Sequence, residues 1–341
     1  LENHVMDDAF GSMHIKQVTA KKIDAFYERL SRGQVLLRSG KIEDREPVSN
    51  TTIQRINRTL NIPFKYAFEY GDINHANPFK IVDLPVATPT VYDTLTQEDI
   101  DTAFKKLAGI DEFIVRAFFM LSALTGWRRG EIAALDWDSV DFDRKIIRIR
   151  RSMSKQPTDF ATISIPRGVK NVYAIKTTKT ERERNYPLDE QLEAIFIALK
   201  EYHEKLKASH PCWETMVQLY SLNKDKRLAA PEPHNLVFRW ENGEYLRPDY
   251  MTKWHKKFMK EVFPDKTIRF HDERHSYAQN MLKAQVPMNE VQTLLGHARI
   301  STTIDQYGHI DGEDCRESAR EYSKRYNIDS LYTATDSDKI E

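Results

Sequence analysis

Apolar residues recur every three to four positions over most of this chain, which is the spacing of amphipathic helices. In residues 18–37, for example, Ile23, Phe26, Tyr27 and Leu30 share one face of the predicted helix. The same pattern predicts further helices at about residues 50–70, 97–108, 111–124, 189–206, 248–263, 271–286, 288–295 and 313–325. The chain is therefore expected to be largely helical.

Alternation with a period of two is clearest at residues 145–151, where Ile and Arg alternate as in a half-buried strand. Two further strands are expected at residues 171–176 and 182–187. Asn242-Gly243 lies between two short apolar runs and indicates a hairpin. The predicted fold class is mainly α with a small antiparallel β-sheet, an α+β protein.

Two stretches carry no regular pattern. Residues 152–170 are long for a hairpin turn, and we expect either a loop or an added ribbon there. Residues 209–233 are expected to be an irregular insertion with aromatic residues.

A proline-containing linker divides the predicted elements into two groups. We expect a helical domain at residues 14–84, the linker at 85–91, and a larger domain at 92–341 whose tail helix begins at about residue 312. The first thirteen residues begin with Leu and contain Gly-Ser-Met, which resembles a cloning junction. We expect this leading segment to lie outside the fold.

Composition is that of an ordinary globular protein, with 40% hydrophobic and 30% charged residues. No apolar run approaches the roughly 20 residues that span a bilayer. The two cysteines, Cys212 and Cys315, are far apart and fit a reducing compartment, so a cytoplasmic protein is expected.

The formal net charge of zero argues mildly against a nucleic-acid partner, because DNA-binding proteins usually carry a basic excess. The distribution of charge weakens that objection. Residues 141–184 hold twelve Lys or Arg against five Asp or Glu, and such a local basic patch is enough for phosphate contacts.

Residues 271–309 gather four histidines and two arginines. His271, Arg274 and His275 stand at i, i+3 and i+4, so one helix presents them on roughly one side. Gly296 suits a helix C-cap and places His297 in the following turn. The two histidines of the helix also have the spacing of a zinc pair, but no third ligand lies nearby in the sequence.

Singly, each of these residues has a common structural explanation, whereas their combination resembles the tyrosine recombinase (phage integrase) family. The sequence TGWRRGEI at residues 125–132 comes first, followed by a lysine ahead of Tyr186-Pro187-Leu188. HDERH, LLGH and a tyrosine ten residues after that histidine complete the family's motifs in order. Residues 14–84 resemble the family's helical core DNA-binding domain, and residues 92–341 its catalytic domain.

The resemblance implies a role for each matching position. Arg128 and Arg274 would hold the scissile phosphate, and Glu131 would support the first of them. The implied catalytic set is Arg128, Lys179, His271, Arg274, His297 and Tyr307, with Tyr307 as the nucleophile. Lys176 is a nearby rival to Lys179. The candidate DNA-contacting residues are Arg55, Arg58, Lys65, Arg148, Arg150 and Lys176.

The function implied is site-specific recombination that integrates and excises a mobile element or prophage, through a 3′-phosphotyrosyl intermediate and a Holliday junction. No metal ion, cofactor or ATP is expected. Expected partners are double-stranded DNA recombination sites and three further copies in a homotetramer, which accessory directionality or DNA-bending proteins could join. A membrane partner is not expected, and the DNA-bound protein would be nucleoid-associated. The alternatives are a type IB topoisomerase and a catalytically silent DNA-binding regulator.

Overall fold

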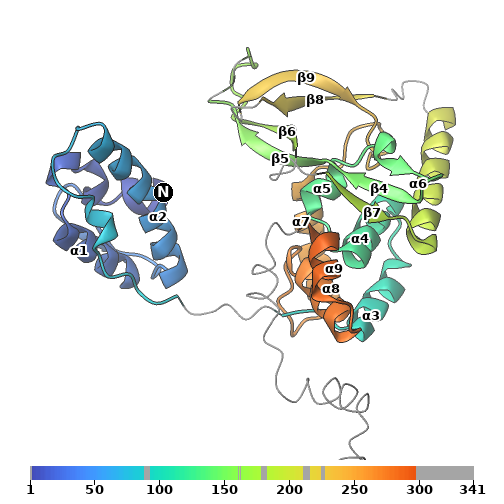
Figure 1. Ribbon diagram of the computed structural model, residues 1–341, viewed down its shortest axis with the longest axis horizontal. Coiled ribbons are helices and arrows are strands. Elements are labelled where there is room, and N and C mark those ends of the chain that lie inside the picture. Colours follow the sequence, from blue (N-terminus) through green and yellow to red (C-terminus); the bar gives the residue numbers. More distant parts are fainter. Residues whose placement is uncertain are drawn as a thin grey trace, which may run out of the picture. The chain divides into compact units, whose positions relative to one another are not determined.

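The protein is described by a computed structural model that covers residues 2–87, 93–159, 161, 163–177, 183–209, 216–223 and 227–296. The chain divides into two compact units, Leu1–Val91 and Tyr92–Glu341, which are coloured from blue to cyan and from cyan to red in Figure 1. Each unit has its own hydrophobic core.

The first unit is built on two helices, α1 and α2, whose apolar faces pack together. Ser49 caps α2, because its hydroxyl accepts a hydrogen bond from the Thr52 amide, and Pro63 lies inside the helix. The elements of this unit are η1 (Glu2–Met6), η2 (Ala9–Ser12), η3 (Ile15–Gln17), α1 (Ala20–Ser31), β1 (Gln34–Leu36), β2 (Ile42–Asp44), α2 (Asn50–Glu69) and η4 (Pro78–Lys80).

The expectation that the first thirteen residues lie outside the fold is wrong. Phe10 is buried and stacks on Phe26 of α1 with 4.5 Å between the ring centroids. The buried carboxylate of Asp8 accepts hydrogen bonds from the Arg29 guanidinium at 2.7 and 3.1 Å. This helical unit is small, so the additional apolar surface completes a core that α1 and α2 leave incomplete.

Helix α1 ends at Ser31, earlier than residue 37. Gly33 has φ of +69°, and a Cβ at this position would stand 2.2 Å from the Arg45 carbonyl oxygen. A left-handed glycine in close contact with backbone turns the chain into the hairpin of β1 and β2, which a periodicity of apolar residues does not reveal.

The second unit places helices around a central apolar helix, α4. Its helices are α3 (Gln97–Leu107), α4 (Phe113–Thr125), α5 (Arg129–Ala133), η5 (Trp137–Ser139), α6 (Glu190–Ser209), α7 (Pro248–Val262), α8 (Asp272–Lys283) and α9 (Met288–Leu295). A capping box starts α3, with Thr96 and Asp99 each bonded to the other's backbone amide. Among the described residues, no helix combines the length and apolarity that crossing a membrane requires.

Two sheets accompany these helices. Strands β3 (Val140–Asp141), β4 (Ile146–Ile149) and β7 (Arg184–Pro187) form an antiparallel sheet in the order β3-β4-β7. Strands β5 (Arg151–Pro157), β6 (Asn171–Thr177), β8 (Val217–Leu222) and β9 (Leu228–His234) form the second sheet, in the order β5-β6-β8-β9 (Figure 1). The mainly α fold with small sheets is thus confirmed.

The second sheet differs from the sequence-based prediction in two respects. The stretch at residues 209–233, expected to be irregular, contains β8 and most of β9. Strands β6 and β8 also pair in parallel, so the sheets are not wholly antiparallel. β9 contains two prolines and lies at the sheet's edge, where proline is tolerated but the sequence pattern of a strand is lost.

Candidate active site

Arg128 stands where α4 ends and α5 begins. Gly126 closes α4 with φ of +60°, and a Cβ there would lie 2.7 Å from Cδ1 of Tyr277 in α8. Only glycine permits both the left-handed turn and this close approach. Trp127 then enters the core, and Arg128 follows with its side chain 44% exposed.

The carboxylate of Glu131 holds Arg128 in place. Its Oε1 accepts a hydrogen bond from Arg128 Nη1 at 2.9 Å, and its Oε2 accepts one from the Arg128 backbone amide at 3.1 Å. The side chain of Glu131 is buried whereas that of Arg128 is half exposed, so the ion pair is partly solvated. This arrangement supports the positioning role that the sequence resemblance implies for Glu131.

A second arginine, Arg184, also bonds to the carboxylate of Glu131. It was not among the site residues predicted from the sequence. Its Nη2 lies 2.6 Å from Glu131 Oε2 and its Nη1 lies 3.2 Å from Oε1. Strand alternation could have revealed it, because Arg184 is two residues before the buried Tyr186 in β7 and shares its face.

The two arginines determine the protonation of Glu131. Burial by itself raises the pKa of this carboxyl, but the hydrogen bond and charge of Arg184, and then those of Arg128, lower the pKa to about 2. Glu131 is therefore an anion at neutral pH, placed between two cations.

Arg274 is buried in α8 and joins two helix ends. Its Nη1 donates to the Gly126 carbonyl at 2.9 Å and its Nη2 to the Leu295 carbonyl at 2.6 Å. These carbonyls belong to the C-terminal ends of α4 and α9, whose partial negative charge suits a guanidinium. In Figure 1, α8 lies beside α4 and α9 lies beside α8, which brings residues distant in sequence together.

His271 precedes α8 and faces the same region as Arg128 and Arg274. Burial lowers its pKa to about 4, with smaller lowering effects from His275, Arg274 and Arg128. The imidazole is consequently neutral near pH 7 and can accept a proton. His275 is buried with its ring 5.2 Å from that of His271, and burial lowers its pKa as well.

One pocket of about 580 Å³ brings Arg128, His271 and Arg274 together. Among the described residues, five cationic side chains and a single carboxylate line it, so an anionic group such as a phosphodiester fits its charge. The cations are Arg128, Arg129, Lys155, Arg269 and Arg274, and the carboxylate is Asp249.

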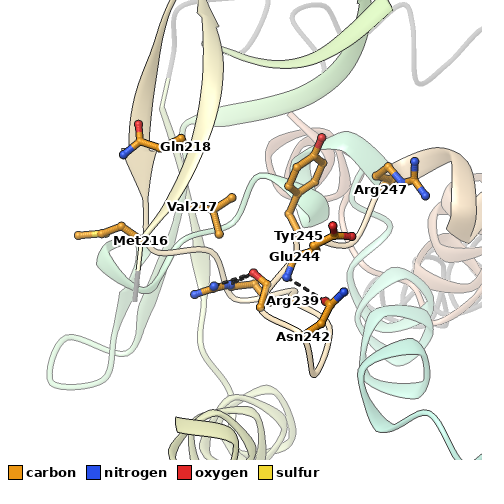
Figure 2. A pocket seen from close by; sticks show the side chains of 9 residues that line it. Met216, Val217, Gln218, Arg239, Asn242, Glu244, Tyr245 and Arg247 are labelled. Atoms are coloured by element: carbon orange, nitrogen blue, oxygen red, sulfur yellow. Dashed lines mark hydrogen bonds between the residues drawn. The ribbon is translucent and has the colours of Figure 1, made fainter. Parts of the chain in front are cut away.

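A second pocket, of about 680 Å³, contains none of the predicted site residues (Figure 2). It lies where the predicted Asn242-Gly243 turn reverses the chain. Arg239 donates to the Gly243 carbonyl from Nε at 2.9 Å and from Nη2 at 2.6 Å, and the Glu244 amide donates to Asn242 Oδ1. These bonds stabilise the hairpin, whose strands pair at Arg239 and Tyr245.

Three predicted catalytic residues, Lys179, His297 and Tyr307, and the tail helix lie outside the described residues. Lys176 is in β6, paired with Ser152 of β5. Of the candidate DNA-contacting residues, Arg148 forms an ion pair with Asp141 at 2.7 Å, and Arg150 approaches Asp136 at 4.0 Å. The remaining three are exposed on α2: Arg55, Arg58 and Lys65.

The family model of the phage integrase family matches residues 93–313. A tyrosine recombinase XerC-like protein of Caldanaerobacter subterraneus subsp. tengcongensis is 29% identical over 321 residues, covering 90% of this chain and 71% of that protein. The ICEBs1 integrase of Bacillus subtilis is 24% identical over 324 residues, covering 93% of this chain and 74% of that protein.

Solved structures show the same fold. The Tn1549 transposon integrase in complex with transposon right end DNA superposes with a TM-score of 0.68 at 18% identity, over 94% of this chain and 90% of that one. The XerH site-specific recombinase bound to its difH substrate gives a TM-score of 0.57 at 17% identity, over 91% of this chain and 74% of that one. The chain therefore belongs to the phage integrase family of tyrosine recombinases, enzymes that break and rejoin DNA.

Proposed function

We propose that this protein is the site-specific recombinase of a mobile element, and that it cuts DNA by attack of Tyr307 on a phosphate held by Arg128 and Arg274. The observation that carries this proposal is the cation-rich pocket, into which two distant segments bring Arg128, His271 and Arg274. Relatives named as an integrase of ICEBs1 and as transposases of Tn916 and Tn1545 support the mobile-element assignment.

The two arginines address the main obstacle to the reaction. A phosphodiester repels nucleophiles, and its non-bridging oxygens gain further charge in the transition state. The guanidiniums of Arg128 and Arg274 both line the pocket, and each is a planar fork of N–H donors that matches the geometry of phosphate oxygens. Together they would stabilise that charge with forked hydrogen bonds.

The reaction also needs a proton acceptor and a proton donor. A phenol has an ordinary pKa near 10, so Tyr307 needs a proton acceptor, and the neutral imidazole of His271 suits that task. The phenolate oxygen bonds to phosphorus as the bond to the 5′-oxygen breaks, and Lys179 would protonate that departing oxygen. His297 would donate a hydrogen bond to a phosphate oxygen. The reverse reaction, with the 5′-hydroxyl of another strand, rejoins the DNA without ATP.

Strand exchange between two sites requires several active sites at once. We propose a homotetramer on two double-stranded DNA sites, with exchange through a Holliday junction and with accessory proteins that bend DNA or set direction. Arg55, Arg58 and Lys65 of the first unit, and Arg148, Arg150 and Lys176 of the second, are the proposed phosphate contacts. The protein would be associated with the nucleoid while it is bound to DNA.

The two alternative functions are less well supported. A type IB topoisomerase would relax supercoiled DNA as a monomer, without strand exchange, whereas the relatives are named as recombinases, integrases and transposases. A catalytically silent regulator would have no need for a histidine and two arginines that line one pocket. Relaxation of a supercoiled plasmid without any recombinant product would favour the topoisomerase.

A covalent-trapping experiment tests the proposed chemistry. A nicked duplex, first selected from a random DNA library by binding to this protein, is incubated with the enzyme and run on a denaturing gel. We expect a covalent protein–DNA band with the wild type and with Tyr326→Phe, and none with Tyr307→Phe. Absence of the band for the wild type, or its persistence in Tyr307→Phe, would refute the mechanism.

A further inference from the structure

Arg184 contacts the active-site framework without lining the pocket. It is the first residue of β7, opposite Ile149 of β4, and its side chain is only 12% exposed. Both of its terminal nitrogens bond to Glu131, one to each carboxylate oxygen, at 2.6 and 3.2 Å. Such bidentate contacts restrict a carboxylate more than a single bond does.

The shared carboxylate sets the position of Arg128. Glu131 Oε1 accepts from Nη1 of both Arg128 and Arg184, so the two guanidiniums lie on either side of one anion. The buried Arg184 holds Glu131, and Glu131 in turn holds the half-exposed Arg128. Because one anion faces two cations, the cluster of Arg128, Glu131 and Arg184 carries a net positive charge, which favours a phosphate.

Arg184 also supports the turn that ends α9. Gly296 has φ of +68°, and a Cβ there would lie 2.8 Å from Cδ and 2.9 Å from Nη1 of Arg184. Arg184 therefore occupies the space that a side chain at position 296 would need. The preceding carbonyl, that of Leu295, accepts from Arg274 at 2.6 Å, so Arg274 is bonded to this turn and Arg184 lies against it.

We propose that Arg184 is a positioning residue of the recombination reaction, which aligns Arg128 through Glu131 and supports the Gly296 turn that leads to His297. This inference rests on the proposed function, in which Arg128 and His297 hold the scissile phosphate. Arg184, a side chain of strand β7, contacts both Glu131 of the TGWRRGEI segment and Gly296 of the LLGH segment. Arg184 would act through these neighbours and would not touch DNA.

The test measures DNA binding and single-turnover cleavage separately in the full-length chain, with the nicked duplex used for covalent trapping. For Arg184→Gln we expect affinity for that duplex within about threefold of the wild type but cleavage at least about tenfold slower, because positioning acts mainly on the transition state. Arg184→Lys keeps the charge and one hydrogen bond, so it should restore part of the rate. A purely structural role would not give this recovery at equal folded fraction, measured by circular dichroism.

A double-mutant cycle identifies the route through Glu131. If Arg184 acts through that carboxylate, then adding Arg184→Gln to Glu131→Gln should slow cleavage by less than about threefold beyond the slower single variant. Arg116→Gln is the control, because it removes a partly buried arginine of α4 that lies over Phe113. Its effect on the cleavage rate should be independent of Glu131, so the fold-losses of Arg116→Gln and Glu131→Gln should multiply in the double variant.

The outcomes separate this inference from the proposed function. The positioning role alone would be overturned if folded Arg184→Gln cleaved DNA at the wild-type rate. It would also be overturned if the fold-losses in cleavage rate of Arg184→Gln and Glu131→Gln multiplied in the double variant. Absence of any covalent product from the wild type would overturn the proposed function first. If Arg184→Gln fails to fold, Arg184→Lys decides the question, because a rate equal to that of the wild type would contradict the need for a bidentate contact.

Discussion

At the scale of single residues, the arginines of this protein differ in what surrounds them. Arg128 is half exposed and bonded to a carboxylate, whereas Arg274 is buried and bonded to two backbone carbonyls. Both line the same pocket. Arg274 thus has a structural as well as a chemical task, and Arg128 depends on its neighbours for position.

This difference predicts separable effects of two substitutions. Arg274→Ala leaves the Gly126 and Leu295 carbonyls without their charged donor, so we expect a loss of about 2–4 kcal/mol in the free energy of unfolding. Arg128→Ala removes a partly solvated pair while Arg184 still neutralises Glu131, so the loss should stay below about 1 kcal/mol. Both should reduce cleavage by at least about 100-fold. Urea denaturation together with covalent trapping measures the two effects, and equal stability of the two variants would contradict this account.

At the scale of elements, glycines allow the close packing that assembles the site. Gly126 lets α4 end against Tyr277, and Gly130 lets α5 lie against β5. A Cβ at Gly130 would stand 2.5 Å from the Met153 carbonyl oxygen and 2.7 Å from Ser152 Oγ. Helix α5, which follows Arg128, can therefore pack against β5 only if residue 130 has no side chain.

Gly130→Ala should consequently push α5 away from β5. We expect a loss of about 1–3 kcal/mol in the free energy of unfolding, because the contacted atom is backbone and cannot move aside easily. Cleavage should fall as well, since Gly130 lies between Arg128 and Glu131. Gly109→Ala is the control, because its Cβ would meet only the Lys106 carbonyl oxygen at 3.6 Å, and its stability should change by no more than about 1 kcal/mol. Equal thermal denaturation curves for the two variants would show that α5 packs differently.

At the scale of the whole molecule, a net charge of zero coexists with a local excess of cations. The pocket is strongly basic, and the first unit exposes Arg55, Arg58 and Lys65 on α2. Electrostatic attraction to DNA depends on where charges lie more than on their sum. The zero net charge is therefore compatible with phosphate binding.

The proposed phosphate contacts predict the salt dependence of DNA binding. Each contact releases about one counterion, so Arg58→Ala should reduce the slope of log affinity against log salt by about 0.9. Lys105→Ala, an exposed cation on α3, serves as the control and should leave the slope unchanged. Fluorescence anisotropy over a salt series measures both. An unchanged slope in Arg58→Ala would remove that residue from the DNA interface.

Local sequence patterns determined most of the elements and the motif residues of this protein. Apolar periodicity placed α2, α3 and α4. These features depend on neighbours within a few positions, which a sequence displays directly. Arg128, Glu131, His271 and Arg274 were likewise evident from their motifs.

Only the tertiary structure decided how the motifs meet. Phe10 lies in the core of the first unit, strand β8 pairs in parallel with β6, and Arg184 bonds to Glu131 53 positions away. Each of these features depends on a contact between segments that are distant in sequence. A local sequence pattern does not reveal which distant segment a residue will contact. The sequence therefore predicted which residues could hold a phosphate. Long-range packing decided what keeps these side chains in place. The buried guanidinium of Arg274 needs acceptors, which the distant Gly126 and Leu295 carbonyls supply, and Arg184 of a distant strand holds the Glu131 that bonds Arg128.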